Sequence, residues 1–77
     1  MKQIRRKLGK YLKKIREECS MTLLQVAAYL EIYKIECSYV SLSRIESGKQ
    51  ALRADVLAGL SLIYEIRADE ILFRGHS

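Results

Sequence analysis

The sequence predicts an all-α fold, a compact single domain of five short helices spanning residues 1–77. Apolar residues recur at three- and four-residue spacing rather than in alternation, the chain contains no proline, and short polar residues or glycine stand where each helical pattern breaks. A chain of 77 residues buries only a thin core, which short helices with local contacts can form. A hydrophobic fraction of 49% is ordinary for a folded domain.

The first helix is predicted over residues 3–18. Its apolar residues form one stripe along the helix, namely Ile4, Leu8, Tyr11, Leu12 and Ile15. Lysine and arginine occupy most of the other positions, and the polar residues Ser20 and Thr22 mark its end.

Two shorter helices are predicted next, over residues 23–30 and 39–46. Thr22 and Ser38 precede them as N-caps. Gly48 ends the second of these helices, because glycine readily adopts the left-handed conformation that follows a helix. Residues 31–37 show neither a helical nor a strand period, and we interpret them as a connection, either a loop or a short extended stretch.

A fourth helix is predicted over residues 54–64 and a fifth over residues 68–73. Residues 74–77 are predicted to be a frayed tail. No internal repeat or low-complexity segment divides the chain, so one domain is expected.

The net charge of +5 is concentrated near one end of the chain. Residues 2–16 contain eight lysines and arginines and no acid, whereas the rest of the chain has six against nine aspartates and glutamates. This asymmetry indicates a polyanionic partner, either nucleic acid or an anionic membrane. The basic residues could contact phosphates or could form a solubilising face, and the sequence leaves both open for Lys2, Arg5, Arg6, Lys7 and Lys10.

The sequence argues against several other classes of protein. Cys19 and Cys37 are far apart and lack a histidine partner, so we expect reduced thiols in a cytoplasmic protein and no metal site. No apolar run approaches the length of a bilayer span or of a signal peptide. No nucleophile with its base and no glycine-rich phosphate loop is present, so we expect no enzyme, no cofactor and no small-molecule ligand.

The second and third predicted helices have the arrangement of a helix-turn-helix. In that motif the first helix lies across the DNA backbone, and the second enters the major groove by its N-terminal end. Leu42 and Ile45 can hold the second helix to the core while Tyr39, Val40 and Arg44 face outward. Arginine commonly contacts guanine, and a tyrosine ring or a valine can contact the thymine methyl group. Spacing alone is equally compatible with a short helix that has a solvated polar face.

Three segments of the chain resemble the phage-repressor, Cro-like (Xre) helix-turn-helix family. Residues 42–49, LSRIESGK, resemble the family signature ISRIENGK. Residues 21–27, MTLLQVA, are similar to its LTQEELA, and residues 12–18, LKKIREE, to its LRxLREE. The segments occur in family order, and the similarity extends over residues 8–72.

The resemblance implies a lambda-repressor-like five-helix domain and assigns roles to individual residues. It implies an ion pair between Arg16, late in the first helix, and Glu46, at the end of the third. The implied base contacts are Tyr39, Val40, Ser43 and Arg44. The implied phosphate contacts are Thr22, Ser38, Ser41, Lys49, Gln50 and Arg53.

The sequence departs from the family pattern at two places. Leu23 stands where family members usually have a glutamine that contacts phosphate. The connection before the third helix is about five residues longer than the usual tight turn, and residues 30–38, LEIYKIECS, resemble a subset of members with the longer pattern LQLxGIxIS.

The sequence therefore predicts a cytoplasmic transcriptional regulator, repressor-like, that binds specific double-stranded DNA as a homodimer. The expected dimer surface lies around Ile66 to Phe73, with Phe73 as an exposed anchor. The alternative is a protein-interaction module on the same fold, antitoxin-like or regulator-binding, with weak or no DNA binding. Leu23 and Tyr39 both fit that alternative.

Overall fold

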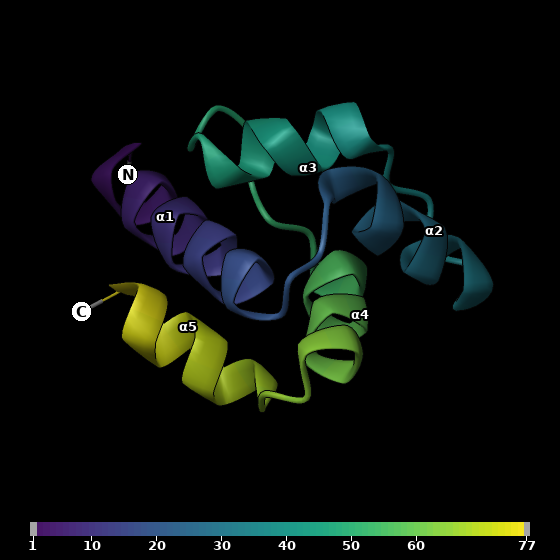
Figure 1. Ribbon diagram of the computed structural model, residues 1–77. Coiled ribbons are helices and arrows are strands. Elements are labelled where there is room, and N and C mark those ends of the chain that lie inside the picture. The colour runs from purple at the N-terminus through teal and green to yellow at the C-terminus, as the bar shows by residue number, and fades with distance from the viewer. Residues whose placement is uncertain (1, 77) are drawn as a thin grey trace.

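The computed structural model describes residues 2–76, and the side chains of residues 3–75. Residues 2–76 form five helices and no strand: α1 (Lys2–Glu18), α2 (Leu23–Ile32), α3 (Tyr39–Glu46), α4 (Ala54–Tyr64) and α5 (Ala68–His76) (Figure 1). The predicted all-α, five-helix fold is therefore confirmed.

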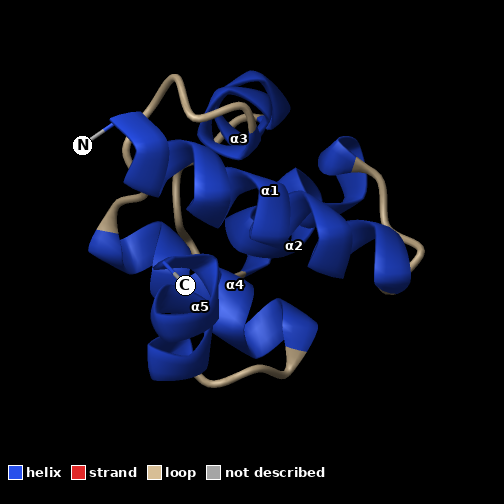
Figure 2. Cartoon of the chain, turned by 90° about the vertical axis from the view of Figure 1, so that its left-hand side faces the viewer, coloured by secondary structure: helices blue, strands red, loops and turns tan. Residues whose placement is uncertain are grey.

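The helices pack so that α1 lies between α3 on one side and α5 on the other (Figure 1). Helix α2 packs against α3 and α4, and α4 also contacts α5 (Figure 2). All five helices contribute apolar side chains to one core. Its buried members are Leu12, Ile15, Val26, Leu30, Leu42, Ile45, Val56, Leu60, Tyr64 and Ile71.

Helices α2 and α3 start at the capping residues expected from the sequence. The Thr22 hydroxyl accepts a hydrogen bond from the Gln25 amide at 3.1 Å, and the Gln25 side chain accepts one from the Thr22 amide at 2.8 Å. The Ser38 hydroxyl accepts a hydrogen bond from the Ser41 amide at 3.1 Å. Such caps satisfy amides that no helical carbonyl can reach, and each stabilises its helix by about 1 kcal/mol.

Helix α2 is two residues longer than predicted and ends at Ile32 instead of residue 30. Its end is closed by Lys34, whose φ of 62° lies in the left-handed region usually filled by glycine. The Ile35 amide donates to the Leu30 carbonyl at 2.9 Å. Because no glycine marks this turn, the sequence gives no signal for the place where the helix ends.

Helix α5 continues to His76, so the prediction that residues 74–77 form a frayed tail is wrong for residues 74–76. Gly75 is buried, and the last turn of α5 packs against Leu8 of α1. This contact with the first helix stabilises a segment whose own sequence lacks a helical signal. Residue 77 of the predicted tail lies outside the described residues.

Gly9 allows α1 and α3 to approach each other closely. A Cβ atom at this position would lie 2.5 Å from the carbonyl oxygen of Ile45 and 2.7 Å from the carbonyl carbon of Glu46. Both atoms belong to the α3 backbone and cannot move aside as the end of a side chain can. The glycine, unfavourable within an isolated helix, is therefore required by the packing of α3 on α1.

We expect Gly9→Ala to lower the free energy of unfolding by about 1–3 kcal/mol, although alanine is the better helix former. Urea denaturation measures the change. The matched control is Gly59→Ala in α4, whose new Cβ would meet side-chain ends, among them Ile35 Cδ1 at 2.8 Å. Those ends can rotate away, so the control should be less destabilised. Equal effects of the two substitutions would contradict the close backbone contact.

Candidate nucleic-acid interface

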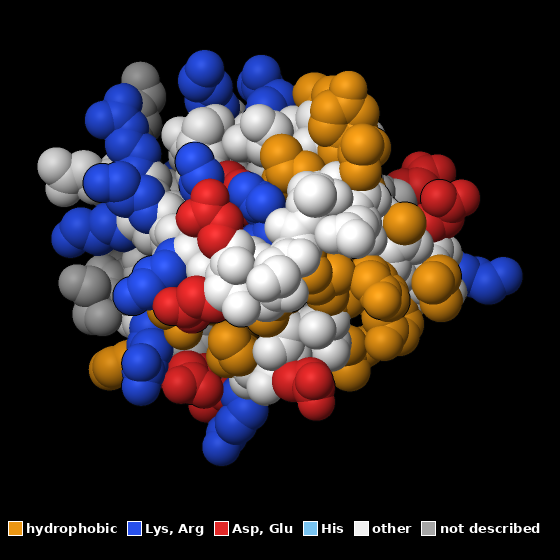
Figure 3. Space-filling model, viewed as in Figure 1, with side chains coloured by type: hydrophobic (Ala, Val, Ile, Leu, Met, Phe, Trp, Pro, Cys, Tyr) orange, Lys and Arg blue, Asp and Glu red, His pale blue; other side chains and the backbone are white. Residues whose placement is uncertain are grey.

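Positive side chains gather on the side of the molecule formed by α1 and along the edge formed by α3 (Figure 3). Acidic side chains on the same view lie both among the blue ones near α1 and around the other helices. The described cations of α1 other than Arg16 are exposed, so the excess positive charge of the sequence lies at the surface. The residues that the sequence assigns to DNA contacts lie on α3 and around the starts of α2 and α4.

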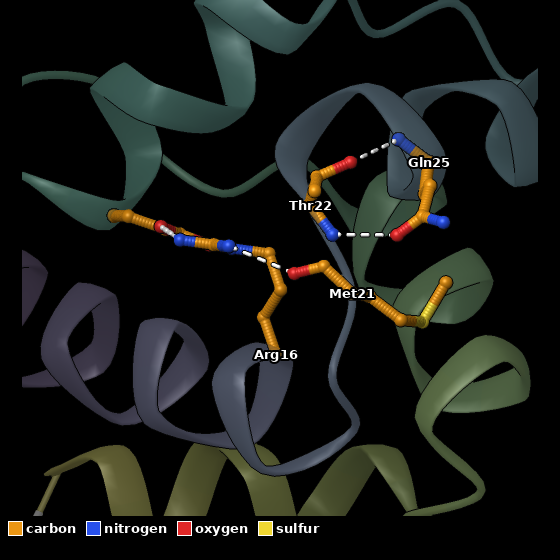
Figure 4. Close-up of polar contacts among 5 residues, drawn as sticks. Arg16, Met21, Thr22 and Gln25 are labelled. Atoms are coloured by element: carbon orange, nitrogen blue, oxygen red, sulfur yellow. Dashed lines mark hydrogen bonds and ion pairs between the residues drawn. The ribbon is translucent and has the colours of Figure 1, made fainter.

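Arg16 and Glu46 join α1 to the end of α3. Arg16 Nε donates to Glu46 Oε2 at 2.8 Å, and a second guanidinium nitrogen donates to Oε1 at 3.0 Å. The remaining guanidinium nitrogen donates to the Met21 carbonyl at 2.9 Å (Figure 4). One arginine therefore holds the first helix, the turn before α2 and the last residue of α3 in a fixed arrangement.

The Arg16–Glu46 pair lies at the edge of the core. Only 11% of the Arg16 side chain and 9% of the Glu46 side chain are exposed. The hydrogen bonds with Glu46 raise the pKa of Arg16, so the cation persists despite partial burial. Burial also raises the pKa of the Tyr64 phenol, and the nearby Glu46 carboxylate adds to this effect. The Arg16–Glu46 ion pair therefore lies beside Tyr64, whose phenol stays neutral.

The four predicted base contacts share the solvent-facing side of α3. Tyr39, Val40, Ser43 and Arg44 are all exposed, whereas Leu42 and Ile45 on the opposite side are buried in the core. Tyr39 is 48% exposed and Val40 52%, although both are large apolar residues. The structure therefore places apolar and cationic groups together on one exposed helix face, as a base-contacting surface requires.

Three predicted phosphate contacts, Thr22, Ser38 and Ser41, have structural roles at helix starts. The Thr22 hydroxyl caps α2, and the Ser38 hydroxyl caps α3 and also donates to the Ser41 hydroxyl at 3.3 Å. Ser41 is half-buried. At these positions the backbone amides of the helix N-termini are the stronger candidates for holding a phosphate.

Lys49 and Gln50 follow the turn that ends α3. Gly48 has a φ of 78°, a conformation natural to glycine, and its amide donates to the Ile45 carbonyl at 3.1 Å. The Lys49 amide donates to the Arg44 carbonyl at 2.8 Å. The Lys49 side chain is exposed, and Gln50 is half-buried. The turn therefore presents one lysine beside the C-terminal end of α3.

Arg53, also predicted to contact phosphate, is engaged within the protein. Its guanidinium binds the Asp55 carboxylate at 3.1 and 3.2 Å and the Glu36 carbonyl at 2.5 Å. The hydrogen bonds from Arg53 lower the pKa of Asp55. Arg53 thus braces the connection before α3 against the start of α4. Sequence reasoning missed this brace, because a contact to a backbone carbonyl 17 residues away leaves no sequence pattern.

The long connection also forms one wall of an open groove that the sequence does not reveal. Leu24 and Ala28 of α2, Ile35 and Cys37 of the connection, and Tyr39 of α3 line it. Burial raises the pKa of the Cys37 thiol, and the charge of Arg53 opposes this effect.

Leu23, the residue that replaces the family glutamine, is half-buried against the core rather than presented to solvent.

Within the described residues, no group of three or more histidines, cysteines, aspartates and glutamates is placed to hold a metal ion. In that part of the chain, no helix has both the length and the apolar character needed to cross a membrane.

A comparison with protein-family models matches residues 12–71 to the model described as helix-turn-helix. The match includes both partners of the Arg16–Glu46 pair, the whole of α2 and α3, and the turn after α3. No curated protein and no solved structure matches the chain.

We expect Arg16→Ala to lower the free energy of unfolding by about 3 kcal/mol, because it leaves the Glu46 carboxylate partly buried without its partner. The double variant Arg16→Met/Glu46→Leu removes both charges and should recover much of that loss. Urea denaturation measures both. The control is Arg67→Ala, which removes a pair whose side chains are 83% and 72% exposed; its effect should stay below about 1 kcal/mol. Similar effects of the two alanine substitutions would contradict the role given to Arg16.

Proposed function

Because the chain belongs to the Cro/C1-type, Xre-like helix-turn-helix family, we propose that it binds specific double-stranded DNA sequences and regulates transcription as a repressor. The observation that carries this proposal is the exposed face of α3, held outward by Leu42, Ile45 and the Arg16–Glu46 pair. On this proposal the protein acts in the cytoplasm, where it occupies an operator and excludes other proteins from the same groove.

Helix α3 enters the major groove by its N-terminal end. Arg44 donates to O6 and N7 of guanine, an interaction that discriminates against a wrong base by about 1–3 kcal/mol. Tyr39 and Val40 contact thymine methyl groups, which fits two apolar side chains left half-exposed at the start of the helix. Ser43 belongs to the same exposed face, and its hydroxyl can donate a hydrogen bond to a base edge or accept one from it.

Phosphate contacts surround this face and set its register on the duplex. Lys49 and Gln50 contact the backbone beside the end of α3. The capped starts of α2 and α3, at Thr22, Ser38 and Ser41, contribute backbone amides. Arg53 supports the connection before α3 from within the protein and, being 53% exposed, retains access to a phosphate.

The domain acts as a two-fold homodimer on half-sites one helical turn apart. Support comes from exposed apolar side chains on the expected dimer surface: Phe73 is 77% exposed and Leu72 47%. Ile66 is half-buried, and Ile71 belongs to the core. The dimer contact therefore rests on Phe73 and Leu72 rather than on all of the segment around Ile66 to Phe73.

A fluorescence anisotropy titration tests the proposal, with duplexes selected from random DNA, unrelated duplexes and a series of salt concentrations. We expect two chains to bind each selected duplex. Arg44→Ala should reduce the preference for the selected sequence by about tenfold or more. Lys49→Ala should weaken binding to all sequences alike and lower the dependence of log K on log salt by about 1.

Absence of duplex binding at low salt would overturn the proposal and favour a protein-interaction module on the same fold. One observation favours that second function: Leu24 is 64% exposed and Ile32 71% exposed on α2. An apolar surface of this kind can bind a protein partner. Binding that retains full sequence preference in Arg44→Ala would contradict the role of α3 given above.

A further inference from the structure

Helix α1 carries a basic surface that the proposed contacts of α3 do not use. Eight lysines and arginines lie between residues 2 and 16. Among those whose side chains the structure describes, only Arg16 forms an ion pair inside the protein. The basic side chains of the described part of α1 other than Arg16 are all exposed, namely Arg5, Arg6, Lys7, Lys10, Lys13 and Lys14. Figure 3 shows blue side chains covering this side of the molecule.

The N-terminal half of α1 lies directly beside the turn that follows α3. A Cβ atom on Gly48 would lie 2.7 Å from Arg6 Cγ and 3.0 Å from Arg6 Cα, so the backbone of the turn touches the helix at this residue. Lys49 is the next residue along the turn. The basic surface of α1 is therefore continuous with the phosphate contacts proposed at the end of α3.

Helical periodicity identifies which cations share the face that meets this turn. Lys10 and Lys13 follow Arg6 at four and seven residues, the spacing that places side chains in one row. We name Arg6, Lys10 and Lys13 the basic flank. Seven residues of helix rise by about 10 Å, and one DNA strand presents a phosphate for about each 3.4 Å along its axis. The length of the flank therefore corresponds to about three phosphate steps along one strand.

No carboxylate within the described residues neutralises the basic flank. The ion pairs within the described residues involve other cations: they join Glu46 to Arg16, Asp55 to Arg53, Asp69 to Arg67 and Glu70 to Arg74. Arg6 and Lys10 are like charges four residues apart, which destabilises a helix, and the first acid of α1 is Glu17, four residues after Lys13. An external polyanion would relieve this repulsion.

Packing of α1 favours DNA over a membrane as that polyanion. A surface-bound membrane helix inserts its apolar face into the lipid. Leu12 and Ile15 of the apolar stripe are buried in the core at 1% and 4% exposure, and Leu8 packs against it. Only Ile4 of the described apolar stripe is exposed, at 43%. The helix therefore offers mainly charged side chains, which adjoin the proposed DNA interface.

We propose that the basic flank binds backbone phosphates outside the base pairs contacted by α3, so that the domain covers more DNA than its recognition helix alone. This inference rests on the proposed function. Under this proposal, α1 provides most of the affinity for DNA that does not depend on base sequence, because phosphate contacts depend on salt and not on base sequence.

The test is the double variant Lys10→Gln/Lys13→Gln, which leaves the packed residue Arg6 in place. The control is Arg67→Gln/Arg74→Gln, with the same change in net charge on the side of α1 away from α3 (Figure 1). Anisotropy titrations over about 50 to 300 mM KCl give the slope of log K against log salt. We expect the flank variant to lower this slope by about 2, near 0.9 per lost contact, equally for selected and unrelated duplexes. The control should keep the wild-type slope.

Each other outcome has a distinct meaning. If the wild-type protein binds duplexes and the flank variant keeps the full slope, the inference is overturned while the proposed function stands. Absence of duplex binding by the wild-type protein overturns the proposed function itself. Binding to vesicles containing phosphatidylserine, lost in the flank variant and without any duplex binding, would identify a membrane as the partner and overturn the inference.

Discussion

The contact between α1 and the end of α3 is the constraint on which the structure depends. Helix α3 has eight residues, too few for a helix to be stable alone in water. Its position is set by the Arg16–Glu46 pair, which spans 30 residues of sequence, and by the close approach that Gly9 permits. Without these contacts, Tyr39, Val40, Ser43 and Arg44 would have no fixed direction. A helix that must fit a groove by a few side chains requires that direction to be determined in advance.

The cations of α1 have two different roles. Arg16, the last cation of the helix, is turned inward and neutralised by Glu46 at the edge of the core. The cations from Arg5 to Lys14 remain exposed, and Arg6 touches Gly48 at the turn where Lys49 begins the proposed phosphate contacts. One helix thus holds the recognition helix in place and extends the positive surface beside it. Under the proposed function, this arrangement accounts for the concentration of the excess charge in residues 2–16.

Features determined by neighbouring residues were predictable from the sequence, and features determined by distant packing were not. Thr22 and Ser38 mark helix starts because their hydroxyls bond amides three residues away. The end of α2 was missed because Lys34, not glycine, adopts the left-handed conformation there. The last turn of α5 was missed because Gly75 is stabilised by Leu8, at the other end of the chain. For the candidate site, the outward face of α3 followed from its period, whereas the engagement of Arg53 with the Glu36 carbonyl did not.

The most direct test of the account is a map of the DNA-contacting surface, obtained from backbone amide chemical shifts while a selected duplex is added to the labelled protein. The account predicts the largest changes in residues 38–50 and in the N-terminal half of α1, with little change where α4 joins α5 around Arg67. Residues 38–50 would respond to the groove and the first half of α1 to the flanking phosphates. Largest changes on the α4–α5 side, with residues 38–50 unaffected, would contradict the claim that α1 positions α3 for recognition.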